Sequence, residues 1–514
     1  MSVLRAPQGH GAVLADPPLH DAASLLDHNR RVLASPLHVL GRPLADLRRL
    51  ARNETGNLAL QYAPGVPGAN DGVLIVAGHQ PEFFHPGVWV KNFALAGLAR
   101  THRGTALNLV VDNDTAKSTR LRVPVGDHFV TLPFDHWQGE VPYEERHVLD
   151  DALFAALPER LGPVIRDWPF TPLLAQVWKE TGVSPLLGER ISAARRTLER
   201  RWGCCNLEVP LSRVCGSESF AWFACHVLAD LARFREIYND AVHGYRAAHG
   251  LRSNNHPVPD LAAQGSWREA PFWAWRTGST RRGRLFAQQR GSLLCLRAGD
   301  EDWPTLPLAP ADALVGAFRQ LEGRGYKVRS RALTTTLFAR LLLADLFIHG
   351  IGGAKYDELT NVIFDGFYGL APPRFLTLSA TLLLPFARVP AADDGCRALA
   401  RMARDVHHNP QRHLPAHAPR GAFALAEEKK AWIVRPGPTH ADRVERFNRL
   451  KQVTEDLRGY TADAERDALQ KLTQCRKNTE INQVLFRRDY AFCLYPEAEL
   501  RPFLQSFLKP AAVS

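Results

Sequence analysis

Long apolar runs are missing from this sequence. Its most apolar segment, residues 375–387, is short and is interrupted by Pro385, and the N-terminal segment contains no apolar stretch of signal-peptide length. A membrane-spanning helix needs about 20 predominantly apolar residues. We therefore expect a protein that is neither secreted nor inserted into a membrane.

Cysteine is scarce and follows no recognisable spacing. The 514 residues include eight cysteines, with no C-x-x-C pair and no spacing typical of a zinc finger. Disulfide frameworks are typical of small secreted domains, whereas cytosolic proteins keep their thiols reduced. The sequence therefore predicts a reduced cytoplasmic protein without a metal site.

Several catalytic signatures are also absent. The chain contains no H-E-x-x-H, no G-x-S-x-G and no G-x-x-x-x-G-K-[ST] sequence, and it has no internal repeat or low-complexity tract. These absences exclude the ordinary metallohydrolases and serine hydrolases.

Basic residues are in excess. Lys and Arg number 64 against 53 Asp and Glu, so the formal net charge is +11, which favours anionic partners. The basic residues are scattered in modest clusters, such as 281–284 and 324–331, instead of forming a dedicated arm. We expect a small anionic substrate or a nucleotide as ligand, and no membrane or nucleic acid; a homodimer is an open alternative.

The order of apolar patterns predicts a mixed α/β fold with a parallel sheet. Residues 18–60 carry apolar positions at helical spacing. A continuous apolar run at 73–77 is followed by a helical pattern at 87–100 and a second run at 107–111. Strand, helix and strand in this order are typical of a βαβ unit.

The rest of the chain is divided by its patterns. Residues 150–202 and 217–248 are expected to be largely helical, and 268–275 and 292–297 to be strands around an aromatic patch. The predicted division is a helical lead-in (1–70), a core (71–390) with a helical insertion (about 150–250), a helical region (391–483) and a C-terminal segment that returns to the core (484–514).

A long polar stretch at 439–477 carries apolar residues three and four positions apart. This pattern is typical of one arm of a helical hairpin or coiled coil, although Gly459 weakens its middle. The partner helix could be 397–406 or 422–434, and the sequence does not distinguish between them.

Two histidines lie in the segment that leaves the first strand, GHQPEFFHPG at 78–87. The N-terminus of the following helix offers free N–H groups to a phosphate, and a histidine with a pKa near neutrality can donate a hydrogen bond to a transferred oxygen. We predict His79 and His85 as catalytic residues and Gly78 and Gln80 as binding residues. The alternative is that the histidines cap the loop or pack in the core.

Three polar residues, Asp112, Asn113 and Asp114, follow the second strand. Parallel sheets bind ligands at the carboxyl ends of their strands, where carboxylates can bind a ribose hydroxyl, an amine or a divalent metal. We predict Asp112 and Asp114 as catalytic and Asn113 as a binding residue, beside the 78–87 loop. The alternative is a turn in which these side chains cap the next helix.

A glycine-rich string, IHGIGGAKYDE at 348–358, also follows an apolar run and precedes a helical pattern. Its glycines would let a ligand approach the backbone, with Lys355 as the charge. We predict Gly352, Gly353 and Lys355 as binding residues, together with Arg331; the alternative is a tight turn without a ligand.

The order of these three strings is similar to that in the family containing the cysteine-adding enzyme of bacillithiol biosynthesis. The resemblance implies a Rossmann-like core related to nucleotidyltransferases, with helical insertions and an antiparallel coiled coil. The chain departs from the family at His79, where the family has Gln, at 85–87, and at Lys355. The resemblance therefore implies the fold more directly than the substrate.

The function that this resemblance implies is that of a nucleotide-binding ligase or transferase. Such an enzyme would join an amino acid or amine, cysteine in the family, to a small-molecule acceptor, with ATP or ADP and Mg²⁺ in the nucleotidyltransferase style.

Two other functions are also compatible with the sequence. The apolar strand before D-x-D-x-T at 112–115 is typical of haloacid-dehalogenase phosphotransferases, in which Asp112 would be the nucleophile and Asp114 the acid/base. A non-catalytic Rossmann-like protein that binds a ligand or partner is the second alternative.

Overall fold

The computed structural model describes residues 4–65, 72–253, 255–390 and 393–509. The chain forms two units: the first holds Met1–Arg122, Thr131–Leu384 and Arg488–Ser514, and the second holds Val123–Val130 and Pro385–Arg487. The second unit is therefore inserted, for the most part, into the chain of the first.

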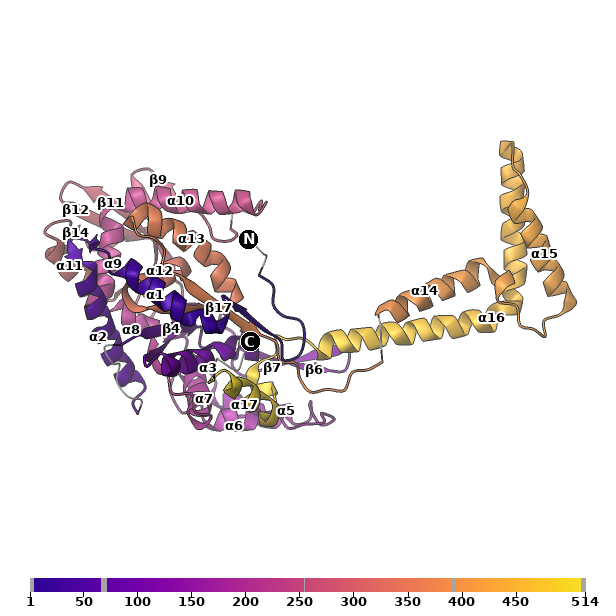
Figure 1. Ribbon diagram of the computed structural model, residues 1–514, viewed down its shortest axis with the longest axis horizontal. Coiled ribbons are helices and arrows are strands. Elements are labelled where there is room, and N and C mark those ends of the chain that lie inside the picture. The colour runs from indigo at the N-terminus through magenta and orange to yellow at the C-terminus, as the bar shows by residue number, and fades with distance from the viewer. Residues whose placement is uncertain (1–3, 66–71, 254, 391–392, 510–514) are drawn as a thin grey trace. The chain divides into compact units, whose positions relative to one another are not determined.

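A six-stranded sheet forms the centre of the first unit (Figure 1). Its spatial order is β1 (Val13–Asp16), β17 (Phe375–Ala380), β16 (Leu346–His349), β4 (Leu74–His79), β5 (Thr105–Val110) and β8 (Leu207–Pro210). All neighbouring strands are parallel except β1, which pairs antiparallel with β17. The prediction of a mixed α/β fold with a parallel sheet is confirmed.

The predicted βαβ unit is present as β4, α3 (Pro86–Thr101) and β5. The run in β4 is continuous and the run in β5 is broken by Asn108, and both strands are largely apolar because they are buried on both faces. The helix α3 begins with Pro86, whose fixed φ suits a first helical turn. In the parallel register, His79 lies opposite Val110. The 78–87 loop and residues 112–115 therefore leave neighbouring strands at the same edge of the sheet, as predicted.

A second sheet in the first unit is antiparallel. Its order is β13 (Glu301–Asp302), β12 (Leu293–Ala298), β11 (Gly283–Arg290), β10 (Trp267–Arg276) and β15 (Tyr326–Ser330), with β14 (Leu306–Pro307) on β12 and β9 (Ala263–Gln264) on β10. Two-stranded pairs are formed by β2 (His38–Val39) with β3 (Arg42–Pro43) and by β6 (Arg120–Val125) with β7 (His128–Pro133). The predicted strands at 268–275 and 292–297 are confirmed as β10 and β12.

Besides α3, the first unit contains helices that pack on its two sheets and on one another. They include α1 (Ala22–Leu33), α2 (Leu44–Tyr62), α4 (Asp151–Ala155), α5 (Leu157–Leu161), α6 (Leu174–Lys179), α7 (Leu187–Arg201), α8 (Leu211–Cys215), α9 (Glu218–Ala229), α10 (Leu231–Ala248), α11 (Ala311–Gly323), α12 (Ala332–Phe338), α13 (Ile351–Tyr368) and α17 (Glu497–Ser506). The prediction for 217–248 is confirmed, whereas 150–202 is helical only in part. Four prolines between 163 and 185 and two glycines interrupt that stretch.

Besides Val123–Val130 from the β6–β7 pair, the described part of the second unit contains the helices α14 (Asp393–His408), α15 (Arg420–Val434) and α16 (His440–Leu485). The long helix α16 is confirmed, and it begins at a capping box between Thr439 and Asp442. Both candidate partners run antiparallel to it. The α14 helix packs at the level of Ala468 and Leu472, and α15 packs at the level of Val453 and Leu457.

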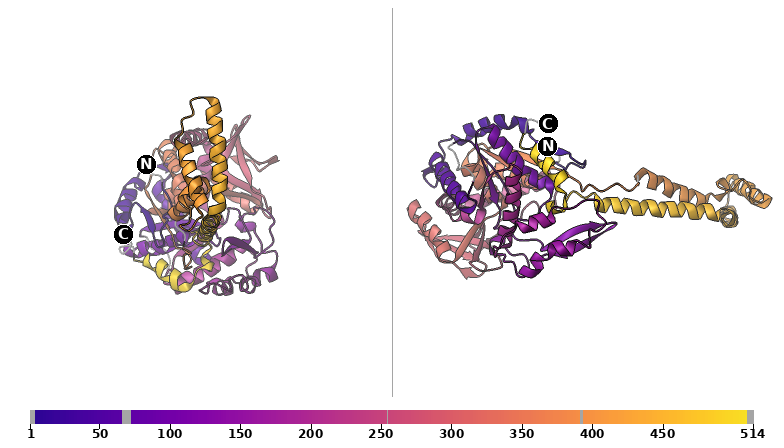
Figure 2. Two further views of the ribbon diagram at one scale, coloured as in Figure 1. Left: turned by 90° about the vertical axis from the view of Figure 1, so that its right-hand side faces the viewer. Right: turned by 90° about the horizontal axis from the view of Figure 1, so that it is seen from below.

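These two levels lie on either side of Gly459 in the sequence of α16. Figures 1 and 2 show α16 with a bend between two straighter segments. The two alternatives from the sequence are thus both realised, each on a different stretch of the long helix.

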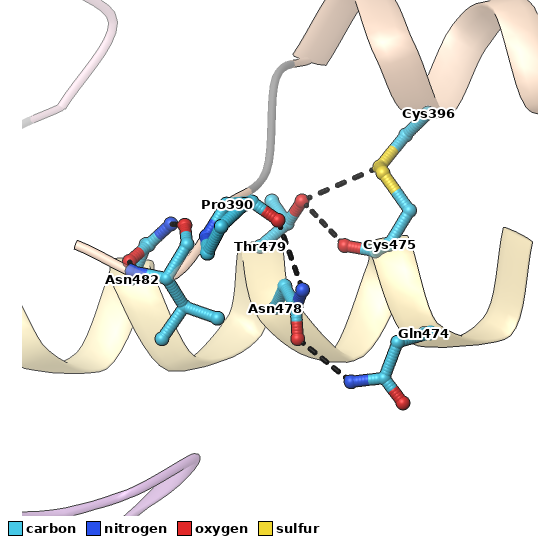
Figure 3. Close-up of a disulfide and its surroundings, with 8 residues drawn as sticks. Pro390, Cys396, Gln474, Cys475, Asn478, Thr479 and Asn482 are labelled. Carbon is cyan, nitrogen blue, oxygen red and sulfur yellow. Dashed lines mark hydrogen bonds between the residues drawn. A yellow bond between two sulfur atoms is a disulfide. The ribbon is translucent and has the colours of Figure 1, made fainter. Parts of the chain in front are cut away.

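A disulfide joins Cys396 of α14 to Cys475 of α16 (Figure 3). The expectation that all eight cysteines stay reduced is wrong for this pair. The two residues are 79 positions apart in the sequence, but the antiparallel packing brings their Cα atoms to 5.7 Å, within the range that a disulfide bridges. In the described ranges, no helix combines the length and apolar character needed to cross a membrane.

Glycine allows a close approach between α3 and the C-terminal segment. A Cβ atom at Gly97 would lie 2.4 Å from the carbonyl oxygen of Phe507. We expect Gly97→Ala to lower the free energy of unfolding by about 1–3 kcal/mol, because the backbone must move to admit the methyl group.

The matched control is Gly316→Ala in α11, where a Cβ atom would meet nothing within 4 Å. This change should raise the free energy of unfolding by about 0.5–1 kcal/mol, because alanine restricts the unfolded chain. Urea unfolding of both variants tests the packing. Equal effects of the two substitutions would contradict it.

Candidate functional site

A cavity of about 640 Å³ lies at the carboxyl ends of the central parallel strands. Along the chain, β4 is followed by β5 and β8 on one side, whereas β16 and β17 are added on the other. The strand order therefore reverses between β4 and β16, and ligands of open α/β sheets bind in the crevice at such a point. The volume is within the range of small-molecule sites, roughly 300–1,000 Å³.

Most of the residues predicted from the sequence line this cavity. They are Gly78, His79, Gln80, His85, Asn113, Asp114, Arg331, Gly352 and Gly353. Asp112 and Lys355 are placed elsewhere, because each lines a different pocket. The three sequence strings are therefore brought together, with the exception of these two side chains.

Asp114 links the loop at 112–115 to the 78–87 loop through hydrogen bonds. Its carboxylate accepts hydrogen bonds from Gln80 Nε2 at 2.8 Å and from its neighbour Thr115 N at 2.8 Å, and it pairs with Arg282 Nη2 at 2.9 Å. Burial raises the pKa of Asp114, but the bonds from Gln80 and Arg282 outweigh it, so its pKa lies below the ordinary value. The carboxylate is thus ionised, and each of its oxygens already accepts at least one hydrogen bond within the protein.

His79 differs from the sequence-based expectation. Its Nδ1 lies 3.0 Å from the carbonyl oxygen of Gln80, so the network assigns the proton to Nδ1 and leaves a lone pair on Nε2. Burial, followed by the charge of Lys91, lowers the pKa of His79 to about 3. The prediction of a pKa near neutrality is therefore wrong, and the neutral ring offers Nε2 as a hydrogen-bond acceptor.

His85 is the N-cap residue of α3 and also lines the cavity. Its Nδ1 is buried without a hydrogen-bond partner among the described residues. Burial, with a further contribution from the charge of Arg488, lowers the pKa of His85 to about 4. This ring is neutral as well at physiological pH.

Lys91 was not predicted from the sequence. It projects from the middle of α3 into the cavity, is 4% exposed, and donates from Nζ to the carbonyl oxygen of Gly78 at 3.0 Å. Burial lowers its pKa to about 8. A lysine followed by Asn92 in the string VWVKNFALAG, which is apolar at its other positions, was the signal available in the sequence.

The ammonium group of Lys91 is an exception among the buried cations of the first unit. The other buried Arg side chains described there pair with carboxylates: Arg48 with Asp345, Arg146 with Asp135, Arg190 with Asp151, Arg195 with Glu199 and Glu208, Arg329 with Glu144 and Arg340 with Asp357. Lys91 forms no ion pair with any described carboxylate. A buried charge without a partner is costly unless a ligand supplies the opposite charge.

The first turn of α13 faces the same cavity. Its N-cap is Gly350, without a side-chain cap, so the N–H groups of Ile351, Gly352 and Gly353 have no partner within the helix. A Cβ atom at Gly350 would lie 4.0 Å from Lys91 Nζ. The ammonium group and the start of α13 are therefore close neighbours.

His349, at the end of β16, was part of the glycine-rich string but not of the predicted site. Its Nε2 lies 2.8 Å from Asp357 Oδ2, which also pairs with Arg340 at 2.6 Å. Burial holds the pKa of His349 below its ordinary value. A Cβ atom at Gly353 would lie 2.7 Å from His349 Nδ1, so glycine is needed there for the ring to occupy this place.

Arginines complete the lining. Arg282 and Arg331 each lie 4.4 Å from the ring centre of Trp273, and Arg331 Nη1 pairs with Glu269 at 2.7 Å. Arg488 donates from Nη2 to Ser379 Oγ at 3.0 Å. With Lys91, these arginines face Asp114 as the single carboxylate in the lining, so the described cavity is electropositive.

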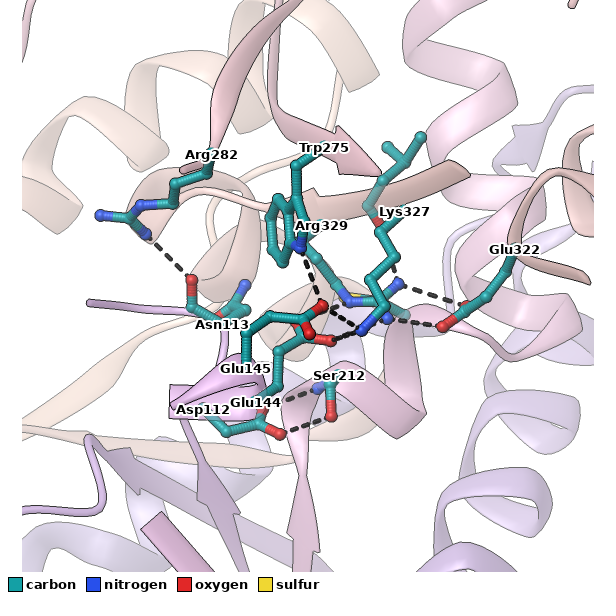
Figure 4. A network of polar contacts seen from close by, with 12 residues as sticks. Asp112, Asn113, Glu144, Glu145, Ser212, Trp275, Arg282, Glu322, Lys327 and Arg329 are labelled. Atoms are coloured by element: carbon teal, nitrogen blue, oxygen red, sulfur yellow. Dashed lines mark hydrogen bonds and ion pairs between the residues drawn. The ribbon is translucent and has the colours of Figure 1, made fainter. Parts of the chain in front are cut away.

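Asp112 lines another pocket, together with Ser212 and Arg329, and Figure 4 shows its carboxylate directed to Ser212. It accepts hydrogen bonds from the backbone N–H of Ser212 at 2.8 Å and from the Ser212 hydroxyl. Burial, followed by repulsion from Glu144, raises the pKa of Asp112 to about 7. Asp112 and Asp114 thus face different pockets, which counts against a phosphotransferase in which both act on one substrate.

Glu144 and Glu145, beside Asp112, belong to a network of ion pairs with Lys327 and Arg329, shown in Figure 4. These charges are matched within the protein.

Comparison with known proteins gives no family. No family model matches the chain, and no curated protein matches it. Within the described residues, no group of three or more His, Cys, Asp or Glu side chains is placed to hold a metal ion.

The raised pKa of Asp112 predicts a pH dependence of stability. Between about pH 4 and pH 7 the folded chain holds a proton on Asp112 that the unfolded chain has lost, so the free energy of unfolding should fall as the pH rises. Asp112→Asn removes this proton equilibrium. In urea unfolding across that pH range, the free energy of unfolding of the variant should increase relative to that of the wild type as the pH rises. A difference between the two that stays constant with pH would contradict the assignment.

Proposed function

We propose that this chain is an enzyme that binds a nucleotide or another phosphorylated small molecule in the cavity between β4 and β16. We further propose that it joins an amine or amino acid to a second small molecule. The observation that carries the proposal is Lys91, a buried ammonium group without a described anionic partner, beside the uncapped start of α13.

Phosphate fits this place for two reasons. Free backbone N–H groups at the start of a helix and the helix dipole favour an anion. The Lys91 ammonium group adds a full positive charge in a site of low solvent access, where the attraction is stronger than in water. Arg488, on the neighbouring side of the lining, is a further donor.

The strand order supports a Rossmann-like core. In chain order, β4, β5, β8, β16 and β17 are arranged as 3-2-1-4-5, which corresponds to the order of a dinucleotide-binding sheet. The resemblance of the three loops to the bacillithiol cysteine-adding family is compatible with this core, and it is the reason for proposing a ligase or transferase.

The side chains of the lining fit the phosphate groups of a nucleotide better than they fit a metal ion. Mg²⁺ requires free oxygen ligands, but Asp114 is held by Gln80, Arg282 and Thr115. The cations of the lining instead fit phosphate oxygens directly. ATP or ADP therefore fits the cavity, whereas a protein carboxylate free to hold Mg²⁺ is not found in the described lining.

The neutral imidazole of His79 suggests its part in the reaction. With its proton on Nδ1, it presents the Nε2 lone pair 4.0 Å from Glu82 Oε1. Nε2 would accept a hydrogen bond from the attacking amine and orient it, since a ring with a pKa of about 3 is too weak a base to keep the proton. As the amine forms its new bond to carbon, the bond from carbon to the leaving oxygen breaks, the amine proton leaves with that oxygen, and Lys91 would hold it. Glu82, whose pKa is raised by burial and by Asp114, lies beside it.

A substitution of Lys91 should change ligand affinity and thermal stability in different ways. For Lys91→Met we expect ADP binding at least about 10-fold weaker, because a lost hydrogen bond to a charged group costs about 1.5–3 kcal/mol. The melting temperature without ligand should be unchanged or higher, because an unpaired buried charge is removed. Calorimetric titration and thermal unfolding provide the two measurements.

Lys179→Met is the matched control, since Lys179 is exposed at the end of α6 and does not line the cavity. It should bind ADP as the wild type does. Unchanged ADP affinity in Lys91→Met, or equal losses in both variants, would contradict the proposed site.

The pKa of Lys91 also predicts how binding varies with pH. The free protein loses the ammonium charge as the pH rises through about 8, so ADP affinity should fall above that value. The phosphates of ADP are already ionised there, since their last pKa is about 6. Titrations from neutral to alkaline pH should show this decline in the wild type and none in Lys91→Met. An equal decline in both would exclude Lys91 as its cause.

A further inference from the structure

A smaller pocket, of about 410 Å³, is adjacent to the first cavity. Glu82 and Phe83 of the 78–87 loop line it, whereas His79 and His85 of the same loop line the first cavity. The Nε2 atom of His79 lies 4.0 Å from Oε1 of Glu82. The smaller pocket, named here the Glu82 pocket, therefore borders the first cavity at this pair of side chains.

His79 and Glu82 present hydrogen-bond acceptors to each other. The proton of the His79 ring is on Nδ1, toward the carbonyl oxygen of Gln80, so Nε2 carries a lone pair. The Glu82 side chain forms no hydrogen bond with any described residue. A carboxylate oxygen and a ring nitrogen that both accept cannot bond to one another, so a donor placed between them would satisfy both.

The charged groups around Glu82 leave its carboxylate without a cationic partner. In the described lining, Lys117 pairs with Glu140 at 2.5 Å and Arg122 pairs with Asp489 at 2.7 Å. Arg120 is exposed and forms no ion pair with Glu82. Burial, followed by the charge of Asp114, raises the pKa of Glu82. A donor that also carries positive charge would therefore stabilise this carboxylate more than a neutral donor would.

The rest of the pocket offers an apolar wall. The rings of Phe83 and Phe134 meet edge to face with their centres 5.7 Å apart, and Trp178 stacks on Phe83 at 5.1 Å. Leu187 and Ile191, both buried, also belong to the lining. The volume is sufficient for a small molecule. One unpaired carboxylate beside an aromatic wall matches a cationic group attached to an apolar carbon skeleton.

We propose that the Glu82 pocket binds the amine substrate of the reaction proposed above, as a primary amine on an aromatic carbon skeleton. Its ammonium group donates hydrogen bonds to Oε1 of Glu82 and to Nε2 of His79, and the skeleton packs against Phe83 and Phe134. This inference rests on the proposed function, because it states which kind of amine that reaction joins.

The bound ammonium group must lose one proton before it can attack. The Glu82 side chain is 41% exposed, so water reaches this place. One N–H bond breaks, the proton passes to water, and the electron pair stays on the nitrogen. The two remaining N–H bonds hold the neutral amine on the same two acceptors, with its lone pair free for the new bond to carbon.

Calorimetric titration of the full chain with phenethylamine tests this site. The matched probe is 3-phenylpropionate, which has the same aromatic skeleton with a carboxylate in place of the ammonium group. We expect phenethylamine to bind at least about 10-fold more tightly, because Glu82 attracts the cation and repels the anion. The basic residues Lys117, Arg120 and Arg122 would give the opposite preference if the overall charge of the lining decided the binding.

Glu82→Gln keeps the size of the side chain and removes its charge. It should weaken phenethylamine binding at least about 10-fold, because a hydrogen bond to a charged group is lost. Glu159→Gln is the control, since Glu159 is exposed on α5 and does not line the pocket. It should bind as the wild type does, and thermal unfolding of both variants checks that the fold is intact.

Three results would overturn the proposal. Phenethylamine could fail to bind the wild type at millimolar concentration, 3-phenylpropionate could bind as tightly as phenethylamine, or Glu82→Gln could bind the amine as tightly as Glu159→Gln does. Any of these results, together with an ADP affinity that depends on Lys91, would remove the amine site and leave the phosphate site in place. An ADP affinity that does not depend on Lys91 is instead the signature of failure in the first cavity.

Discussion

The cavity depends on one strand that pairs in parallel with two partners from distant parts of the chain. Ala77 of β4 lies opposite Asn108 of β5 on one edge and opposite Ile348 of β16 on the other. Because parallel strands end at the same edge of a sheet, this double pairing brings together loops that begin near residues 78, 112 and 349. If β16 were placed anywhere else in the sheet, the uncapped start of α13 would lie away from Lys91.

Buried arginines elsewhere in the first unit are paired with carboxylates, whereas Lys91 in the cavity is not. Arg195 lies between Glu199 and Glu208, and Arg146 is paired with Asp135, although all of these side chains are buried. Such pairs compensate the loss of hydration within the protein itself. Lys91 has only a backbone carbonyl as its described partner. The lack of a carboxylate partner, more than the presence of positive charge alone, distinguishes Lys91 from the cations of the structural ion pairs.

The sequence predicted local structure better than long-range arrangement. Apolar runs, continuous in β4 and broken by Asn108 in β5, identified these strands because both are buried on two faces, and periodic spacing identified α16. The pairing of β16 with β4 could not be read, because register between distant strands leaves no trace in either segment alone. The same limit applies to the proximity of Cys396 and Cys475.

The direction of individual side chains was the other limit. Asp112 and Asp114 are two positions apart and would share one face of a continuing strand. The chain turns instead after Val110, and Ser212, which follows β8, donates a hydrogen bond to the carboxylate of Asp112. Lys355 lies only two residues beyond Gly353, yet on the helix α13 this spacing turns it toward another cavity. The sequence therefore predicted where Asp112 and Lys355 lie along the chain relative to the strands, but it did not predict the direction of their side chains.

The place of the second unit in the chain has a consequence for biosynthesis. Arg488, which bonds to Ser379 and Ala380 at the end of β17, leaves the ribosome only after all three helices of the second unit have been made. The same is true of Tyr495, whose hydroxyl donates to the carbonyl oxygen of Leu382. A nascent chain that has completed its sheet still lacks one wall of the first cavity. The second unit thus has time to fold before the C-terminal segment is made, and the lining of the first cavity, to which Arg488 belongs, becomes complete only at the end of synthesis.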